Sequence, residues 1–155
     1  MKPSVVLRIT SLITLIFAVG HSLGGVDSWS PVGETEVLKA MQTFRFDTGG
    51  VSRTYFDFYL GFGFLLSVYL LLQAVLLWQL ATLAKTEALR IRPLLISFLL
   101  ACIVSAGISW KFIFAVPAVS FAVIAAGLGL ALFAASRNKD AQPPVPADGP
   151  QAARR

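Results

Sequence analysis

The stretch "FYLGFGFLLSVYLLLQAVLLWQLATLA", Phe58 to Ala84, contains no Asp, Glu, Lys or Arg. A bilayer core of about 30 Å takes around 20 residues of helix at 1.5 Å each, so this stretch is long enough to cross it. Tyr59 and Trp78 would stand about 28 Å apart along such a helix, which matches the spacing of the two aromatic belts of a membrane. The stretch is therefore predicted to be a transmembrane helix.

Three more stretches are long and apolar, so the chain is predicted to have four spans, at about 5–23, 58–84, 93–110 and 117–136. Arg8 lies one turn inside the first of them, where its long side chain can reach back to the headgroups. Pro93 and Pro117 suit the first turn of a helix, where the missing N–H costs little. The predicted fold is an all-α membrane protein, an up-down bundle of four transmembrane helices over residues 1–136. The proline-rich segment 137–155 is predicted to be a disordered cytoplasmic tail.

The composition agrees with a membrane protein. Of the residues, 56% are hydrophobic and 14% charged, against roughly 45–50% and about 25% in soluble domains. The net charge is +5, but the basic residues gather at the chain ends and in one short loop. Because they form no stripe with exposed aromatic residues, nucleic acid is not an expected partner.

The distribution of Lys and Arg predicts the orientation, because positive loops stay in the cytoplasm. One side carries Lys2, Arg8, Lys85, Arg90, Arg92, Arg137, Lys139, Arg154 and Arg155. The other side carries Lys39, Arg45, Arg53 and Lys111. Both termini are therefore expected in the cytoplasm, with the protein in the cell inner membrane.

The first span has a second interpretation as a signal peptide. Lys2 and Arg8 precede an apolar stretch, and Ala18 and Gly20 fit the positions before a cut at His21. An uncleaved anchor is favoured, because residues 20–24 remain compatible with a helix and offer a pair of small residues for packing.

The segment "GHSLGG", residues 20–25, matches the G-x-S-x-G pattern of serine hydrolases around Ser22. Such an enzyme needs a mostly parallel sheet and a histidine that follows the serine, whereas His21 precedes it and is the only histidine. The match is therefore interpreted as accidental. With Cys102 as the only cysteine, no metal site and no cofactor are predicted.

The loop between the first two spans, residues 26–55, is predicted to hold a short amphipathic helix. Val37, Met41 and Phe44 would share one face, and Glu34 and Glu36 would lie in its first turn. The helix either rests on the membrane surface or folds as a lid over the bundle. The following "DTGGVS", residues 47–52, is interpreted as a flexible turn.

Antiparallel spans would bring several chemically capable residues to one rim on the outer side. The candidate ligand-binding residues are His21, Arg45, Arg53, Tyr55, Asp57, Tyr59, Trp110 and Lys111. Asp57, set among aromatic residues, is expected to need a partner or a raised pKa, with His21 or Arg53 as the partner. The alternative is an interfacial ion pair or a charge at the helix N-terminus.

Polar and small residues inside the spans are expected to serve helix packing. Gln73 and Gln79 should hydrogen-bond a neighbouring helix rather than contact a substrate. Ridges of small residues predict that the third and fourth spans form a tight hairpin, through Ser97, Ala101, Ser105 and Ser109 on one side and Gly127, Ala131 and Ala135 on the other.

With "GHSLGG" and "RTYFDFYLGFGF", the chain resembles a group of small bacterial four-helix membrane proteins over its spans and outer loop. That group has no assigned activity, so the resemblance implies a fold and carries over no functional residue. In size and helix number the chain is also similar to the membrane-associated eicosanoid and glutathione metabolism proteins and to the sterol isomerase-like fold. This second likeness is one of architecture only.

Three functions are compatible with these features. The favoured one is a non-enzymatic membrane protein that binds a lipid, a small amphiphile or a partner membrane subunit at its outer rim, with a second copy of the chain as another partner. An alternative is a membrane-embedded enzyme with Asp57 and His21 as an acid–base pair. A small transporter is disfavoured, because no acidic residue lies at mid-membrane depth.

Overall fold

The computed structural model describes residues 1–24, 30 and 32–137. In chain order its elements are α1 (Pro3–Gly24), α2 (Glu36–Thr43), β1 (Arg45–Thr48), β2 (Val51–Thr54), α3 (Tyr55–Leu83), α4 (Arg92–Phe112) and α5 (Ala115–Arg137). By length and composition, α1, α3, α4 and α5 are each able to cross a membrane. The four predicted spans are thus helices, with bounds that agree to within one turn at each end.

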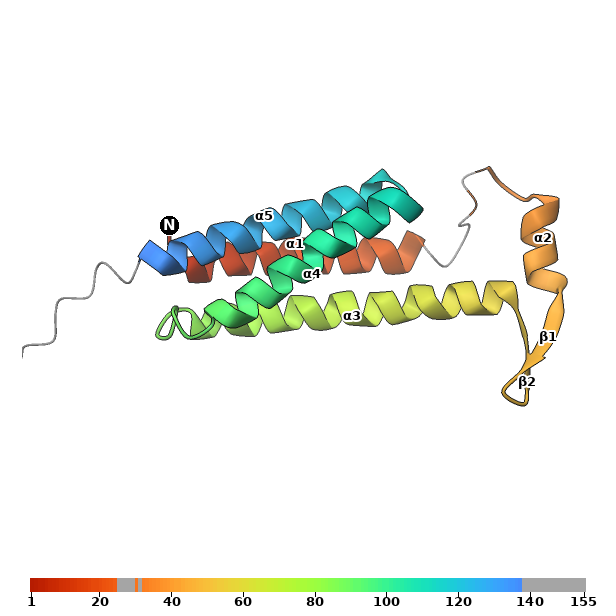
Figure 1. Ribbon diagram of the computed structural model, residues 1–155, viewed down its shortest axis with the longest axis horizontal. Coiled ribbons are helices and arrows are strands. Elements are labelled where there is room, and N and C mark those ends of the chain that lie inside the picture. The colour runs from red at the N-terminus through yellow and green to blue at the C-terminus, as the bar shows by residue number, and fades with distance from the viewer. Residues whose placement is uncertain (25–29, 31, 138–155) are drawn as a thin grey trace, which may run out of the picture.

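The long helices run alternately up and down, so that Pro3 and Arg137 lie at one end of the bundle (Figure 1). Here this end is called the terminal end, and the end that carries α2, β1 and β2 is called the hairpin end. α1 packs between α3 and α5, and α4 packs on α5. α4 crosses the bundle obliquely, starting beside α3 at the terminal end (Figure 1).

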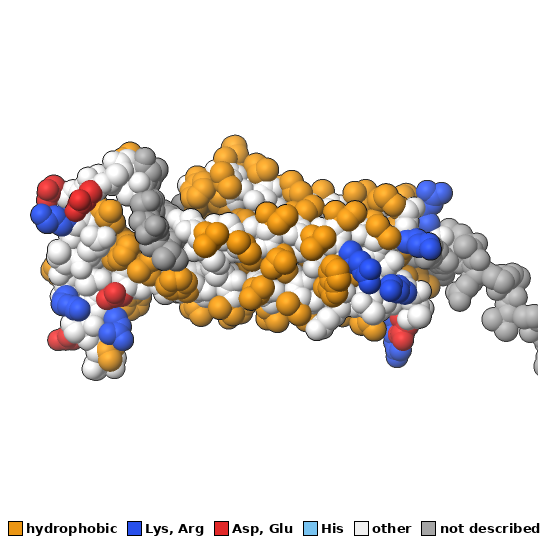
Figure 2. All heavy atoms as spheres, turned by 180° about the vertical axis from the view of Figure 1, so that it is seen from behind, with side chains coloured by type: hydrophobic (Ala, Val, Ile, Leu, Met, Phe, Trp, Pro, Cys, Tyr) orange, Lys and Arg blue, Asp and Glu red, His pale blue; other side chains and the backbone are white. Residues whose placement is uncertain are grey.

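Charged side chains gather at the two ends, and the surface between them is hydrophobic (Figure 2). Large apolar side chains on this surface include Phe62, Leu65 and Val68 on α3 and Leu100 and Val104 on α4, each at least half exposed. A helix whose outer face is as apolar as its packed face is suited to hydrocarbon rather than water. This distribution supports a multi-pass membrane protein.

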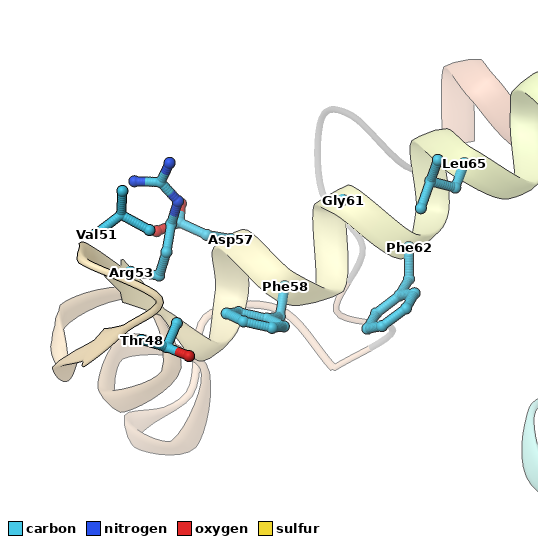
Figure 3. A pocket seen from close by; sticks show the side chains of 8 residues that line it. All are labelled: Thr48, Val51, Arg53, Asp57, Phe58, Gly61, Phe62 and Leu65. Carbon is cyan, nitrogen blue, oxygen red and sulfur yellow. The ribbon is translucent and has the colours of Figure 1, made fainter.

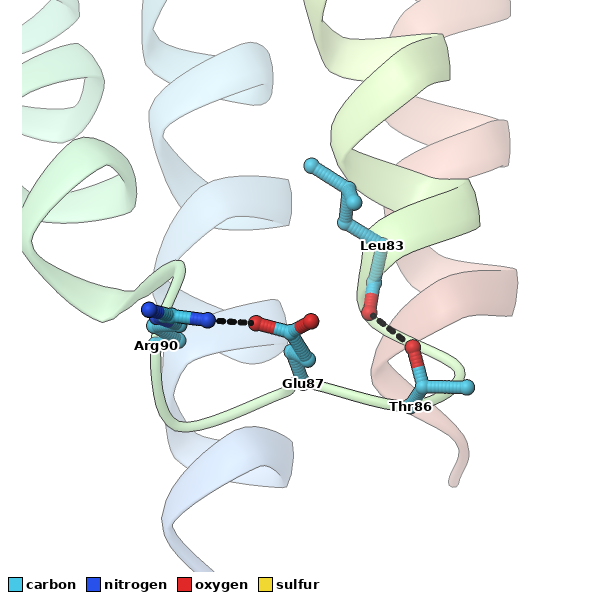
Figure 4. Close-up of polar contacts among 4 residues, drawn as sticks. All are labelled: Leu83, Thr86, Glu87 and Arg90. Atoms are coloured by element: carbon cyan, nitrogen blue, oxygen red, sulfur yellow. Dashed lines mark hydrogen bonds and ion pairs between the residues drawn. The ribbon is translucent and has the colours of Figure 1, made fainter.

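The turn between α3 and α4 is held at the terminal end by polar contacts (Figure 4). Arg90 Nη1 lies 2.9 Å from Glu87 Oε2, and the Thr86 hydroxyl donates to the Leu83 carbonyl at 3.5 Å. α4 then starts at Arg92, with Pro93 in its first turn as predicted.

α1 contributes hydroxyl groups as well as apolar groups to the core. Thr10 and Thr14 donate to carbonyls one turn earlier in α1, those of Val6 and Thr10. Ser11 Oγ donates to the Ala74 carbonyl of α3 at 2.7 Å. These short polar residues satisfy their own hydrogen bonds and let the helices approach closely, as in other membrane bundles.

The predicted pairing of α4 with α5 is confirmed, whereas the predicted ridges of small residues are buried only in part. Gly127 of α5 faces Thr10 of α1, and Ser97 and Ala101 of α4 are exposed. Ser109 of α4 and Ala131 and Ala135 of α5 are buried, as expected for ridge residues. The buried residues of α4, which follow each other at a spacing of seven on one helix face, are Leu95, Cys102 and Ser109.

The predicted hydrogen bond to a neighbouring helix is confirmed for Gln73 but not for Gln79, whose side chain is exposed. Gln73 Nε2 donates to Cys102 Sγ at 3.2 Å, which joins α3 to α4. This contact supplements a helix pair that otherwise meets mainly at the terminal end.

The all-α prediction was wrong in one place. Residues 45–54 form an antiparallel hairpin in which Thr48 pairs with Val51, and not a flexible turn. Gly49 and Gly50 between them have φ values of +56° and +80°. Two positive φ values in a two-residue loop are the type I′ requirement, which Gly-Gly meets without strain.

The predicted amphipathic helix exists as α2, with a different inward face. Leu38 and Met41 are half-buried, whereas Val37 is exposed and Phe44 follows the last helical residue. Of the two acids, only Glu36 lies in the first turn. Thr35 caps α2 by accepting the Leu38 amide at 3.2 Å, and this cap moved the start of the helix past Glu34.

The predicted disordered tail lies outside the described residues except for Arg137, which ends α5.

The contact of Gly127 with Thr10 predicts a specific loss of stability. A methyl group at position 127 would overlap the Thr10 hydroxyl, whereas one at Gly129 would meet nothing within 4 Å. We expect Gly127→Ala to lower the free energy of unfolding by about 1–3 kcal/mol in detergent and Gly129→Ala to leave it unchanged or slightly raised. Thermal unfolding of the two variants checks this, and equal stabilities would contradict the packing described.

Candidate functional site

Three contacts set the register of α1 against α3. The Arg8 guanidinium lies 5.1 Å from the Trp78 ring, Ser11 bonds the Ala74 carbonyl, and His21 Nδ1 lies 3.0 Å from Ser67 Oγ. Residues later in α1 contact residues earlier in α3, as expected for antiparallel helices. The last residues of α1 therefore lie level with the turn of α3 that precedes Ser67. The segment Tyr55–Gly61 at the start of α3 extends about 10 Å beyond the end of α1.

This projecting part of α3 carries α2 and the hairpin. The Phe46 ring lies 4.8 Å from Tyr55 and 5.7 Å from Phe58, and Phe44 stacks on Tyr55 at 6.0 Å. Aromatic pairs at such distances add to the energy of simple burial. They fasten the hairpin against the first turns of α3.

A groove of about 310 Å³ lies between the hairpin and α3 (Figure 3). It is lined by Thr48, Val51, Arg53, Asp57, Phe58, Gly61, Phe62 and Leu65. Thr48 and Val51 are directly paired, and Arg53 stands two residues further along β2, so the three share one face of the hairpin. The groove is open to its surroundings along its length.

The groove is polar at one end and apolar along the rest. Arg53 and Asp57 lie beside the hairpin, and Phe58, Phe62 and Leu65 follow along α3 (Figure 3). Phe62 is 68% exposed and Leu65 54% exposed, so these side chains have apolar surface left to cover. Gly61 leaves open space between them.

Asp57 serves as a helix cap, and the expectation that it is embedded among aromatic residues was wrong. Its side chain is exposed, so the reason for expecting a raised pKa does not hold. Thr54 Oγ1 accepts the Asp57 amide at 3.1 Å, and Asp57 Oδ2 accepts the Thr54 amide at 2.8 Å, which makes a capping box. The alternative of a charge at the helix N-terminus is the one observed.

The predicted Arg53 partnership with Asp57 is electrostatic only. Arg45 and Arg53 both act on the carboxylate through space. Among the residues that the structure describes, the ion pair is Glu87–Arg90, so neither arginine closes a salt bridge with Asp57. Arg53 Nη1 donates to its neighbour's carbonyl, Ser52 O, at 3.0 Å. Arg53 and Asp57 therefore keep further hydrogen-bonding capacity at the groove.

His21 does not meet Asp57, contrary to the predicted acid–base pair. Its imidazole bonds Ser67 and lies edge-on to Phe17, with ring centroids 6.3 Å apart. Ser67 is about 15 Å along α3 from Asp57. The prediction placed the ends of all helices at one depth, whereas α3 projects beyond α1.

The other predicted residues of the hairpin end and of α4 lie outside the lining of the groove. Tyr55 belongs to the aromatic cluster, Tyr59 lies 6.1 Å from the Phe56 ring, and Arg45 starts β1. Trp110 is 73% exposed on α4, and Lys111 Nζ lies 5.0 Å from the Phe112 ring. Neither Trp110 nor Lys111 lines the groove.

Sequence reasoning identified the polar groove residues, Arg53 and Asp57, and missed the apolar ones. The signals for the latter were present. Gly-Gly between short alternating segments favours a hairpin, and Phe58, Phe62 and Leu65 follow each other at helical spacing. Within the described ranges, no group of three His, Cys, Asp or Glu side chains is placed to hold a metal ion.

Comparison of the chain with protein-family models, with curated proteins and with solved structures finds no match.

The capping box predicts that the stability of the α3 N-terminus depends on Thr54, whose side chain is buried. Thr54→Ala removes the oxygen that accepts the Asp57 amide and should cost about 1 kcal/mol of stability. Thr54→Ser keeps that oxygen and should cost less. Thermal unfolding gives the total, and amide hydrogen exchange should speed up at Phe56 and Asp57 in the alanine variant alone. Equal exchange in both variants would contradict the capping role.

Proposed function

We propose that this chain is a multi-pass protein of the inner membrane that binds a membrane lipid or a similar amphiphile in the groove between its hairpin and α3. The observation that carries the proposal is the order of the groove residues. A cation and an anion lie at one end, and an uninterrupted apolar surface leads away from them along a membrane-length helix.

The proposed orientation places the terminal end in the cytoplasm and the hairpin end outside. Among the described residues, the terminal end carries the basic residues Lys2, Arg8, Lys85, Arg90, Arg92 and Arg137, with Glu87 as its acid. The hairpin end mixes bases with Glu34, Glu36, Asp47 and Asp57. The excess of positive charge at the terminal end supports the assignment.

The depth of the groove supports a lipid ligand. α3 has 29 residues and is about 43 Å long, whereas a bilayer core is about 30 Å thick. With Trp78 at one interface, the Tyr55–Tyr59 turn reaches the other, where Tyr and Phe rings and charged groups are both accommodated. Arg53 and Asp57 then lie among headgroups, and Phe62 and Leu65 lie beside the acyl chains.

The open form of the groove favours binding over catalysis. Asp57 is engaged in capping and His21 lies about three helical turns deeper, so no acid–base pair faces the groove. Exposed Phe58, Phe62 and Leu65 form a surface that an acyl chain covers without leaving the membrane.

Filling the groove should reduce lipid binding without unfolding the protein. A side chain at Gly61 enters open space in the groove, and one at Gly63 also meets nothing within 4 Å but lies outside the lining. We expect Gly61→Leu to lose most of the phospholipid retained on gentle purification and Gly63→Leu to keep it. Native mass spectrometry of the full chain in mild detergent measures the bound lipid.

Thermal unfolding in the same detergent should show both leucine variants folded. Wild-type lipid retention by folded Gly61→Leu would overturn the proposed function, because it would show that the groove is not where lipid binds.

A further inference from the structure

We infer that the groove selects a zwitterionic amphiphile in which a primary ammonium stands next to a phosphate, the chemistry of a phosphoethanolamine headgroup. The inference rests on the proposed function and names the ligand class of the same site. It is carried by the simultaneous presence of Arg53 and Asp57 in the lining and by the lack of an ion pair between them.

Arg53 is suited to the phosphate. A guanidinium carries five N–H donors in a planar fork, and one of them is used on the Ser52 carbonyl. The remaining donors are available to phosphate oxygens at the headgroup level. Arg45 lies near enough to act on Asp57 but stands on the opposite face of the hairpin from Arg53, and it is not in the lining.

Asp57 is suited to the ammonium. Oδ2 accepts the Thr54 amide, and a carboxylate has room for several more donors on its two oxygens. A primary ammonium offers three N–H donors, whereas a trimethylated choline offers none. A charge-assisted hydrogen bond therefore discriminates between two headgroups that carry the same charges.

The same carboxylate disfavours a purely anionic headgroup. A phosphate bound at Arg53 alone would lie beside the negative charge of Asp57, and like charges at close range in an interface repel. A positive group on the ligand removes this conflict. The pair of protein charges is thus complementary to a pair of opposite charges on the ligand, with the acyl chain directed along Phe58, Phe62 and Leu65.

The test is a native mass spectrometry titration of the full chain in detergent with dioleoyl phospholipids that carry ethanolamine, choline or glycerol headgroups. We expect the ethanolamine lipid to bind about five- to tenfold more tightly than either of the others. Asp57→Asn keeps an acceptor for the Thr54 amide and should abolish the preference over choline. Arg53→Gln should weaken all three lipids.

Two control variants, Asp47→Asn and Lys39→Gln, remove one negative and one positive charge outside the groove. Asp47 lies on the opposite face of the hairpin and Lys39 lies on α2, and neither residue is in the lining. Both should keep the wild-type preference. If either abolished it, general surface charge rather than the groove would set the selectivity, and the inference would fail.

Water-soluble glycerophosphoethanolamine distinguishes a lipid from a free headgroup. We expect it to displace bound lipid only at a concentration many times higher, because it lacks the acyl chain that the apolar lining covers. Displacement at equal concentration would overturn the amphiphile assignment. Equal binding of the ethanolamine and choline lipids, with Gly61→Leu still impaired, would overturn the headgroup inference and leave the proposed function standing.

Discussion

The antiparallel register of α1 against α3 determines the position of every other feature. Arg8 on Trp78, Ser11 on the Ala74 carbonyl and His21 on Ser67 hold the two helices at one fixed offset. Because α3 is longer than α1, that offset leaves the first turns of α3 beyond the end of α1. The first turns of α3 therefore need partners for their free backbone N–H groups and contacts for their apolar side chains. Thr54 and Asp57 supply the partners, and the hairpin and α2 supply the contacts.

The groove is a result of this arrangement rather than of a closed bundle. The hairpin reaches α3 through the Phe46, Tyr55 and Phe58 rings, and its other face turns outward. The side of α3 next to the hairpin is covered by no other described helix, so Phe62 and Leu65 stay exposed. The proposed lipid site is thus open on one side, which suits a ligand with a polar headgroup and an apolar chain.

Much of this architecture is predictable from the sequence, because hydrocarbon imposes strong rules. Apolar stretches of sufficient length indicate the four spans, and the Gln73 bond to a neighbouring helix follows from the cost of an unpaired amide in lipid. The failures concern relative positions. The level of His21 against Asp57 depends on a register between two helices, which periodicity within each helix does not encode. The hairpin was not predicted although Gly49-Gly50 is a strong local signal for one, because consecutive glycines are also typical of a flexible loop.

The central place of α1 has a consequence for how the protein is made. α1 and α5 lie far apart in the chain, yet they are side by side in the bundle, with Thr10 against Gly127 and the Phe17 and Phe121 rings 5.2 Å apart. During synthesis α1 can pair with α3 first, but its Thr10 side has no protein partner until α5 has been made. A nascent chain that stops before α5 would therefore leave this side of α1 uncovered.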